Sequence, residues 1–309
     1  MLALLAPGQG SQKPGFLTPW LTGWDGADRA TAALRSYSEV TDLDLVRLGT
    51  EADADEIRDT AKTQPLLVAA GLTVAAFLPV DRASVVAGHS IGELTAAGLA
   101  GVLSPDDAVA LAAARGREMA AACALEPTGM SAVLGGVEAE VLERLDALGL
   151  HPANRNGAGQ IVAAGPLPAL AKLADDPPAR ARVIALQVAG AFHTPYMAPA
   201  REALGSVEVT VGEPTATLLS NADGAAVTSG ADALARIVAQ VTSPVRWDSC
   251  QATLLELGVT AAIELAPAGT LAGLAKRAMK GVQVVTVNTP DDLPAAAELI
   301  AAHSSEDPR

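Results

Sequence analysis

The sequence predicts an α/β fold in which a mostly parallel sheet is covered by helices on both faces, with a smaller unit inserted into it. Short apolar runs bounded by Gly or Pro alternate with long helical patterns, as the buried strands of a parallel sheet do. Of the 309 residues, 50% are hydrophobic and only 3% are aromatic, so Ala, Val and Leu must build a large core. The rhythm changes between residues 128 and 189, which indicates the insertion.

The expected strands of the main sheet are apolar runs at residues 2–6, 83–88, 260–265 and 282–287. Two helix starts carry the same signal, which is a capping hydroxyl, a proline in the next position and two acids in the first turn. These starts are Ser104-Pro105-Asp106-Asp107 and Thr289-Pro290-Asp291-Asp292. A strong helical pattern follows the first of them and ends near Cys123.

The stretch at 128–189 reads as strand, helix, strand, strand, helix, strand, which is the split βαβ or ferredoxin-like pattern. We therefore predict two subdomains. Residues 1–126 and 191–309 form the large one, and residues 127–190 form the small inserted one. An insertion usually creates a cleft at its seam, and clefts are where ligands bind.

Composition excludes several classes of function. The formal net charge of −14 argues against a nucleic-acid partner. No uninterrupted apolar run reaches the about 18 residues of a membrane span, and the N-terminus lacks the basic region of a signal peptide, so we expect a cytoplasmic protein without membrane contact. Cys123 and Cys250 lie far apart, and the four histidines have no metal-ligand spacing, so we expect neither a disulfide nor a metal site.

Residues 88–92, Gly-His-Ser-Ile-Gly, fit the G-x-S-x-G pattern of a nucleophilic serine on a sharp turn between a strand and a helix. Glycines suit so tight a turn, and the helix N-terminus behind it favours developing negative charge. Ser90 is thus a candidate nucleophile. The alternative is a Gly-rich turn with an idle serine.

A serine hydroxyl needs a base, and His193 is the strongest candidate because it follows a long apolar run where the insertion returns to the large subdomain. The alternative is a histidine satisfied in the core or a loop. His89 adjoins Ser90 on a tight turn and should point away from it. No acid between residues 91 and 192 stands out at a strand end, so we expect a backbone carbonyl or an amide to orient the histidine.

A second Gly-rich turn, Ala-Pro-Gly-Gln-Gly-Ser-Gln, directly follows the first expected strand. It fails as a dinucleotide fingerprint because Lys13 occupies the position of the third glycine. Its backbone N–H groups could supply one donor of an oxyanion hole, with the amide of Ile91 as the other. An ordinary tight turn is the alternative.

Seven motifs together resemble the malonyl-CoA:acyl carrier protein transacylases of fatty-acid and polyketide synthesis, in order and in spacing. They are PGQGSQ near the N-terminus, TQPLLVAAG at 63–71, GHSIGE at 88–93, AARGREM at 113–119, NGAGQIVAAG at 156–165, GAFH at 190–193 and SPVRW at 243–247. The match covers nearly the whole chain. It implies an α/β-hydrolase-like large subdomain with an inserted ferredoxin-like small one.

The resemblance also implies roles for individual residues. Ser90 would be the nucleophile and His193 the general base and acid, while the backbone amides of Gln9 and Ile91 would form the oxyanion hole. Arg115 would grip the free carboxylate of a malonyl group. A permanently charged, planar guanidinium is well suited to bind a carboxylate through two hydrogen bonds.

Further residues fall on the family's substrate pocket. Gln64 and Asn156 match its amides, Met119 lies in the motif that carries the arginine, and Phe192 would leave no space for an α-methyl branch on the acyl group. The family orients its histidine by a main-chain carbonyl in a segment that corresponds to Ser243 here.

The expected reaction is transfer of a malonyl group from malonyl-CoA to the phosphopantetheine thiol of acyl carrier protein, through a malonyl-serine and without a bound cofactor or metal. The expected partner is that carrier, and the family is often monomeric. An editing thioesterase with the same Ser-His pair is the nearest alternative. A catalytically idle subunit that docks carrier proteins is another, which the presence of both Ser90 and His193 disfavours.

Overall fold

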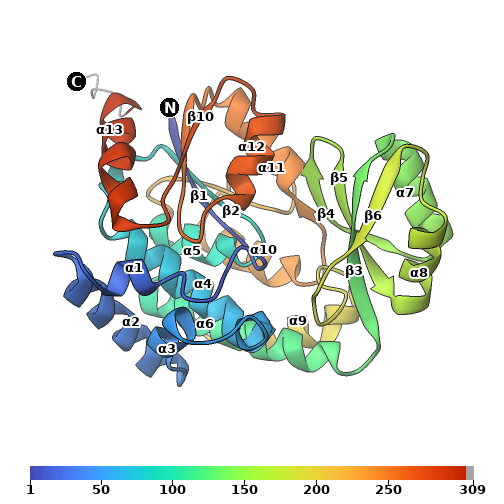
Figure 1. Cartoon of the computed structure of the whole chain (residues 1–309), viewed down its shortest axis with the longest axis horizontal. Helices are drawn as coiled ribbons and strands as arrows, with labels where there is room; N and C mark the ends of the chain where they lie inside the picture. Colours follow the sequence, from blue (N-terminus) through green and yellow to red (C-terminus); the bar gives the residue numbers. More distant parts are fainter. Residues whose placement is uncertain (304–309) are drawn as a thin grey trace.

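Two five-stranded sheets organise the protein, which is represented by a computed structural model that describes residues 1–303 (Figure 1). In the first sheet the strand order is β10-β9-β1-β2-β7, and all neighbouring strands are parallel. The strands are β1 (Leu2–Ala6), β2 (Val85–Gly88), β7 (Thr217–Leu219), β9 (Ala261–Glu264) and β10 (Gln283–Thr286). The four strands expected from the sequence are confirmed, whereas β7 was not predicted.

Helices cover both faces of this sheet, as the alternation along β1 shows. Leu2 and Leu4 belong to the large apolar cluster that also contains side chains of α4 (Thr60–Ala75), α5 (Gly92–Leu99) and α6 (Pro105–Cys123). Ala3 and Leu5 face the other way, into a cluster with α11 (Trp247–Glu256) and α12 (Thr270–Ala278). Successive residues of a strand point to opposite faces, so a strand buried on both faces must be apolar throughout.

The helix-start signals are confirmed. The hydroxyl of Ser104 accepts a hydrogen bond from the amide of Asp107 at 3.1 Å. Thr289 and Asp292 form a capping box, although the chain passes through a short 3₁₀ turn before α13 begins.

Within residues 1–303, no helix is long and apolar enough to cross a membrane. The other helices outside the insertion are α1 (Thr18–Leu21), α2 (Ala27–Thr41), α3 (Leu45–Thr50), α9 (Ala198–Leu204), α10 (Gly230–Gln240) and α13 (Leu293–His303), with 3₁₀ turns at Glu56–Arg58, Val80–Arg82, Pro195–Met197 and Pro290–Asp292.

The second sheet belongs mainly to the insertion. The elements follow in the predicted order, as β3 (Thr128–Gly135), α7 (Glu138–Ala147), β4 (His151–Gly157), β5 (Gln160–Pro166), α8 (Leu167–Asp175) and β6 (Ala181–Ala185). The strands pair antiparallel in the order β6-β3-β5-β4. This is the ferredoxin-like arrangement, and α7 and α8 both lie on the outer face of the sheet (Figure 1).

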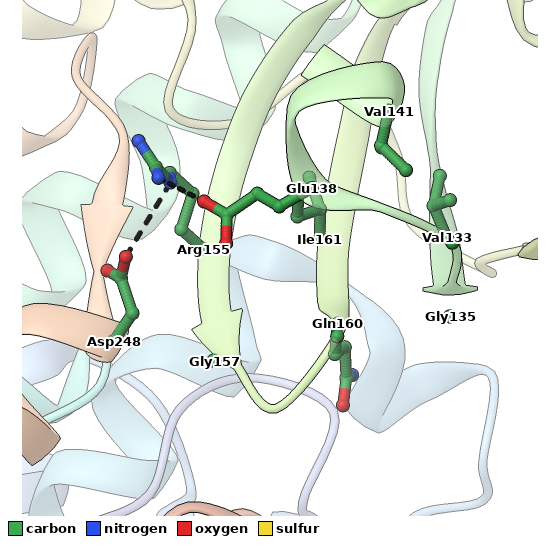
Figure 2. Close-up of a pocket in the computed structure, with 11 residues that line it drawn as sticks. Val133, Gly135, Glu138, Val141, Arg155, Gly157, Gln160, Ile161 and Asp248 are labelled. Carbon is green, nitrogen blue, oxygen red and sulfur yellow. Dashed lines mark hydrogen bonds and ion pairs between the residues drawn. The ribbon is translucent and has the colours of Figure 1, made fainter. Parts of the chain in front are cut away.

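A strand from outside the insertion completes this sheet. β8 (Val245–Arg246) pairs parallel with β4, a contact that the sequence did not predict. Nearby, Arg155 of β4 forms ion pairs with Glu138 of α7 and, at 3.6 Å, with Asp248 of α11, beside a cavity of 210 Å³ (Figure 2). We propose that residues 127–190 are the inserted subdomain, with β8 and this ion-pair cluster as its attachment to residues 1–126 and 191–309.

Candidate active site

Ser90 stands at the turn between β2 and α5, and the two glycines of the motif make this turn possible. A Cβ on Gly88 would lie 2.0 Å from the carbonyl carbon of Gly92, and a Cβ on Gly92 would lie 2.2 Å from the carbonyl oxygen of Ala6. Neither position can therefore hold a side chain. Ser90 itself has a φ of 55°, in the left-handed region that non-glycine residues rarely adopt. The predicted strand-turn-helix context of Ser90 is confirmed.

Asn221, which follows β7, holds this turn in place through two hydrogen bonds of its side chain. Its Oδ1 accepts a hydrogen bond from the amide of Ser90 at 2.8 Å, and its Nδ2 donates to the carbonyl of Gly88 at 2.8 Å. Asn221 is fully buried. These two bonds hold the strained backbone of Ser90, because strain of this kind persists only where the surroundings over-determine it. Sequence reasoning did not identify Asn221, since the strand before it was not predicted.

His193 lies beside Ser90, although 103 positions separate them in the chain. Its Nε2 is 2.7 Å from the Oγ of Ser90, and its Nδ1 is 2.8 Å from the backbone carbonyl of Gln240. A carbonyl can only accept, so Nδ1 carries the proton and Nε2 is free to accept the hydroxyl proton of Ser90. This arrangement can generate a serine nucleophile.

The expectation that a backbone carbonyl orients the histidine is confirmed, but the assignment of that carbonyl to Ser243 is wrong. The acceptor is Gln240, the last residue of α10. Carbonyls in the final turn of a helix lack partners within the helix, so this one is free to accept. The amide of Ser243 donates to the same carbonyl at 3.1 Å, which leaves Ser243 one step removed from His193.

Burial keeps His193 neutral. The pKa of its imidazole is lowered to about 3, mainly by desolvation, with smaller contributions from the positive charge of Arg115 and from the neighbouring His89, while the bond to the carbonyl of Gln240 opposes them. A base that stays unprotonated at neutral pH is ready to accept a proton.

This low pKa predicts a pH dependence of stability. The unfolded chain protonates His193 near pH 6.5 and the folded chain near 3, so between these values the unfolded state binds more protons and stability falls as the pH falls. Going from pH 7 to pH 5, this residue should cost about 2 kcal/mol of unfolding free energy. Urea unfolding at both pH values measures this loss. Between pH 7 and pH 5, the unfolding free energy of His193→Gln should fall by about 2 kcal/mol less than that of the wild type. Equal losses would contradict the assignment.

Arg115 of α6 is a buried cation with only neutral partners in contact. Its Nη1 donates to Oε1 of Gln64 and its Nη2 to Oε1 of Gln240, both at 2.7 Å. Within residues 1–303, no carboxylate lies within 4.0 Å of it. Burial lowers its pKa to about 10, and the charge of Glu93 partly offsets this, so Arg115 remains charged at neutral pH. A buried charge is costly without a counter-ion, so this geometry suits an anionic ligand group.

A cavity of 590 Å³ between the two sheets brings most of the predicted residues together. The predicted residues among its lining are Gln9, Gln64, Ser90, Met119, Asn156, Phe192 and His193. Arg115 lies just behind this lining, in contact with Gln64. The lining also includes His89, whose Nε2 is 2.9 Å from Oδ1 of Asn156 rather than bonded to Ser90. Sequence reasoning missed Met130 and Asn154 of the small subdomain, which have no motif signal of their own.

The two amides expected to form an oxyanion hole are available. Neither the amide of Gln9 nor that of Ile91 donates a hydrogen bond to another group of residues 1–303. The loop that carries Gln9 is packed against the serine turn, because a Cβ on Gly8 would lie 2.7 Å from the carbonyl oxygen of His89. Ile91 is buried, and buried N–H groups without a protein partner are rare, which is consistent with a donor kept for a ligand. Within the same residues, no group of three or more His, Cys, Asp or Glu side chains could hold a metal ion.

Comparison with known proteins shows the family to which the chain belongs. The model of the acyl transferase domain family matches residues 4–291. The malonyl CoA-acyl carrier protein transacylase of Mycobacterium bovis is 58% identical over 306 residues, which cover 97% of this chain and 100% of the relative. The enzyme of the same name from Haemophilus influenzae is 31% identical, with 96% of this chain and 98% of the relative covered.

Solved structures extend the match to three dimensions. The crystal structure of MCAT from Mycobacterium tuberculosis superimposes with a TM-score of 0.90 at 57% identity and covers 96% of this chain and 99% of its own. A malonyl-transacylase in complex with its type II PKS acyl carrier protein has a TM-score of 0.88 at 28% identity and covers 96% and 99%. The resemblance seen in the sequence is thereby confirmed, and the chain belongs to the malonyl CoA-acyl carrier protein transacylase family of acyl transferases.

Proposed function

We propose that this protein transfers a malonyl group from malonyl-CoA to the phosphopantetheine thiol of an acyl carrier protein, through a malonyl ester on Ser90. The observation that carries the proposal is the buried charge of Arg115 behind the cavity that holds Ser90 and His193. An acyl group with a free carboxylate would supply the directly bonded counter-ion that Arg115 lacks, since Glu93 acts on it only from a distance. The relatives, which are named for the same reaction, support this choice of substrate.

In the first half-reaction, Nε2 of His193 accepts the hydroxyl proton while Oγ of Ser90 forms a bond to the thioester carbonyl carbon. The carbonyl oxygen becomes an oxyanion, which the amides of Gln9 and Ile91 stabilise by hydrogen bonds. When this intermediate collapses, the carbon–sulfur bond breaks and the sulfur of CoA takes the proton from His193. The product is malonyl-Ser90.

The second half-reaction reverses these steps with a different thiol. The phosphopantetheine sulfur gives its proton to His193 and attacks the ester carbonyl, the same amides hold the oxyanion, and the bond to Oγ breaks. Oγ then recovers its proton from His193. Both halves use one histidine that alternates between base and acid, and Gln240 holds its ring in a single orientation throughout.

Initial rates test this scheme directly. With malonyl-CoA and holo-carrier varied together, a covalent intermediate predicts parallel double-reciprocal lines. Intersecting lines would contradict the intermediate. Carrier without its phosphopantetheine arm is the control and should receive no malonyl group. Release of CoA without formation of malonyl-carrier would instead assign the protein as a thioesterase.

A further inference from the structure

Glu93 is a buried acid that the mechanism above does not use. It lies in the first turn of α5, three residues after Ser90, and only 3% of it is exposed. Both of its carboxylate oxygens accept hydrogen bonds. Oε1 accepts from the backbone amide of Asn221 at 2.5 Å, and Oε2 accepts from the side-chain amide of Gln240.

These two partners are the residues that hold the reacting groups. Asn221 accepts from the amide of Ser90. Gln240 accepts from Nδ1 of His193 through its backbone carbonyl and from Arg115 through its side-chain oxygen. The carboxylate of Glu93 is therefore one residue removed from the nucleophile, the base and the arginine at once, although it forms a hydrogen bond with none of them.

The arrangement of donors requires a carboxylate in its ionised form. Both neighbours present an N–H group, so both oxygens must accept. A glutamine could face only one of these donors with its oxygen and would turn its own NH₂ group toward the other. A protonated acid is less suited as well, because its hydroxyl would face a donor. A buried network that is only partly satisfied loses much of its rigidity.

The same contact fixes which way the side chain of Gln240 points. Its Nε2 donates to Glu93, and also lies 3.1 Å from the carbonyl of Ser90 and from Oδ1 of Asn221. Its oxygen is thereby left for Arg115. With Glu93 neutral or replaced, the amide could turn over and present its NH₂ group to the guanidinium, where two donors would face each other.

We propose that Glu93 is a positioning residue whose ionised carboxylate locks Gln240 and Asn221, and through them aligns His193, Ser90 and Arg115 for acyl transfer. This inference rests on the proposed function. It predicts that protonation of Glu93 disorders the site, so that activity falls as the pH is lowered through its pKa.

The charges around Glu93 place that transition near neutrality. Burial raises the pKa of Glu93, and four groups partly oppose it, so the pKa is about 7. These groups are the amide of Asn221, the charge of Arg115 on α6, the amide of Gln240 and the charge of Arg236 on α10. The thiol of Cys250 on α11 also faces the carboxylate, and its pKa is raised above the usual range, so it stays neutral. His193 has a pKa of about 3, so it is neutral both above and below the pH at which Glu93 titrates.

The test is the pH profile of kcat/KM for malonyl transfer, measured for the wild type and for Glu93→Gln. The wild type should lose activity below about pH 7. The variant should be about 10- to 100-fold less active at pH 8, from the loss of one hydrogen bond to a charged group, and should lack that acid limb. The matched control is Glu264→Gln, which removes the other buried glutamate of residues 1–303, one that accepts amide hydrogen bonds from Gly269, Leu271 and Ala272 at the start of α12. It should keep the acid limb.

If kcat/KM of Glu93→Gln falls below about pH 7 in the same way as that of the wild type, the inference is overturned. This holds even when the wild type is fully active in malonyl transfer. A wild type without malonyl transfer would instead remove the proposed function, so the two failures are distinct. If Glu93→Gln does not fold, carbon-13 NMR of glutamate-labelled Glu264→Gln protein gives the answer. Its remaining buried carboxyl should titrate near pH 7, and titration below pH 5 would overturn the inference.

Discussion

Ser90→Ala should abolish malonyl transfer, with kcat lowered by roughly four to six orders of magnitude. Removal of a nucleophile that acts as a unit with its base leaves only what binding and the oxyanion hole supply. The change deletes a single oxygen and leaves the backbone, so the fold should persist. The effect is measured as the rate at which malonyl-carrier forms from malonyl-CoA and holo-carrier.

The matched control for this change is Ser131→Ala, which removes a buried hydroxyl on β3, away from the lining of the cavity. It should keep activity within a factor of a few. If Ser90→Ala retained more than about a hundredth of the wild-type rate, a residual rate that the oxyanion hole alone does not reach, Ser90 would not be the nucleophile.

Arg115→Ala should lower kcat/KM for malonyl-CoA by about 150- to 5,000-fold and leave kcat/KM for acetyl-CoA unchanged or higher. The malonyl carboxylate would then be buried without its partner, a loss of about 3–5 kcal/mol. Acetyl has no carboxylate to lose. Rates of CoA release from the two thioesters, measured side by side, give the ratio.

Two variants sharpen this test. Arg117→Ala removes an exposed arginine from the same helix and should change neither rate. Arg115→Lys keeps the charge without the planar pair of donors and should recover only part of the malonyl activity. A similar loss for malonyl-CoA and acetyl-CoA in Arg115→Ala would mean that Arg115 supports the site as a whole and does not select the substrate.

The parts of the site that the sequence predicted are those encoded locally. The G-x-S-x-G pattern lies within two positions of Ser90, and the steric need for Gly88 arises inside that short segment, whereas the need for Gly92 comes from the neighbouring strand at Ala6. His193 was found because few histidines exist and one falls where the insertion ends. The main strands were also predicted correctly, because each is a continuous apolar run and is therefore encoded locally.

The parts that were missed depend on tertiary contacts without a local signature. Gln240 acts through its backbone carbonyl, and any residue that ends α10 could supply one, so nothing at this position separates it from Ser243. Asn221 is set by β7, a strand of three residues, and β8 has two, which is too short for a periodic pattern. The network through Glu93 joins segments more than a hundred positions apart.

Intact-protein mass spectrometry can detect the proposed malonyl ester on Ser90 without relying on kinetics. The wild type is incubated with malonyl-CoA alone, with acetyl-CoA alone, and with malonyl-CoA followed by holo-carrier. We expect one malonyl adduct, located on Ser90, that persists until the carrier is added, and little or no acetyl adduct. Malonyl transfer to the carrier without any adduct, or an adduct that also forms on Ser90→Ala, would contradict this expectation.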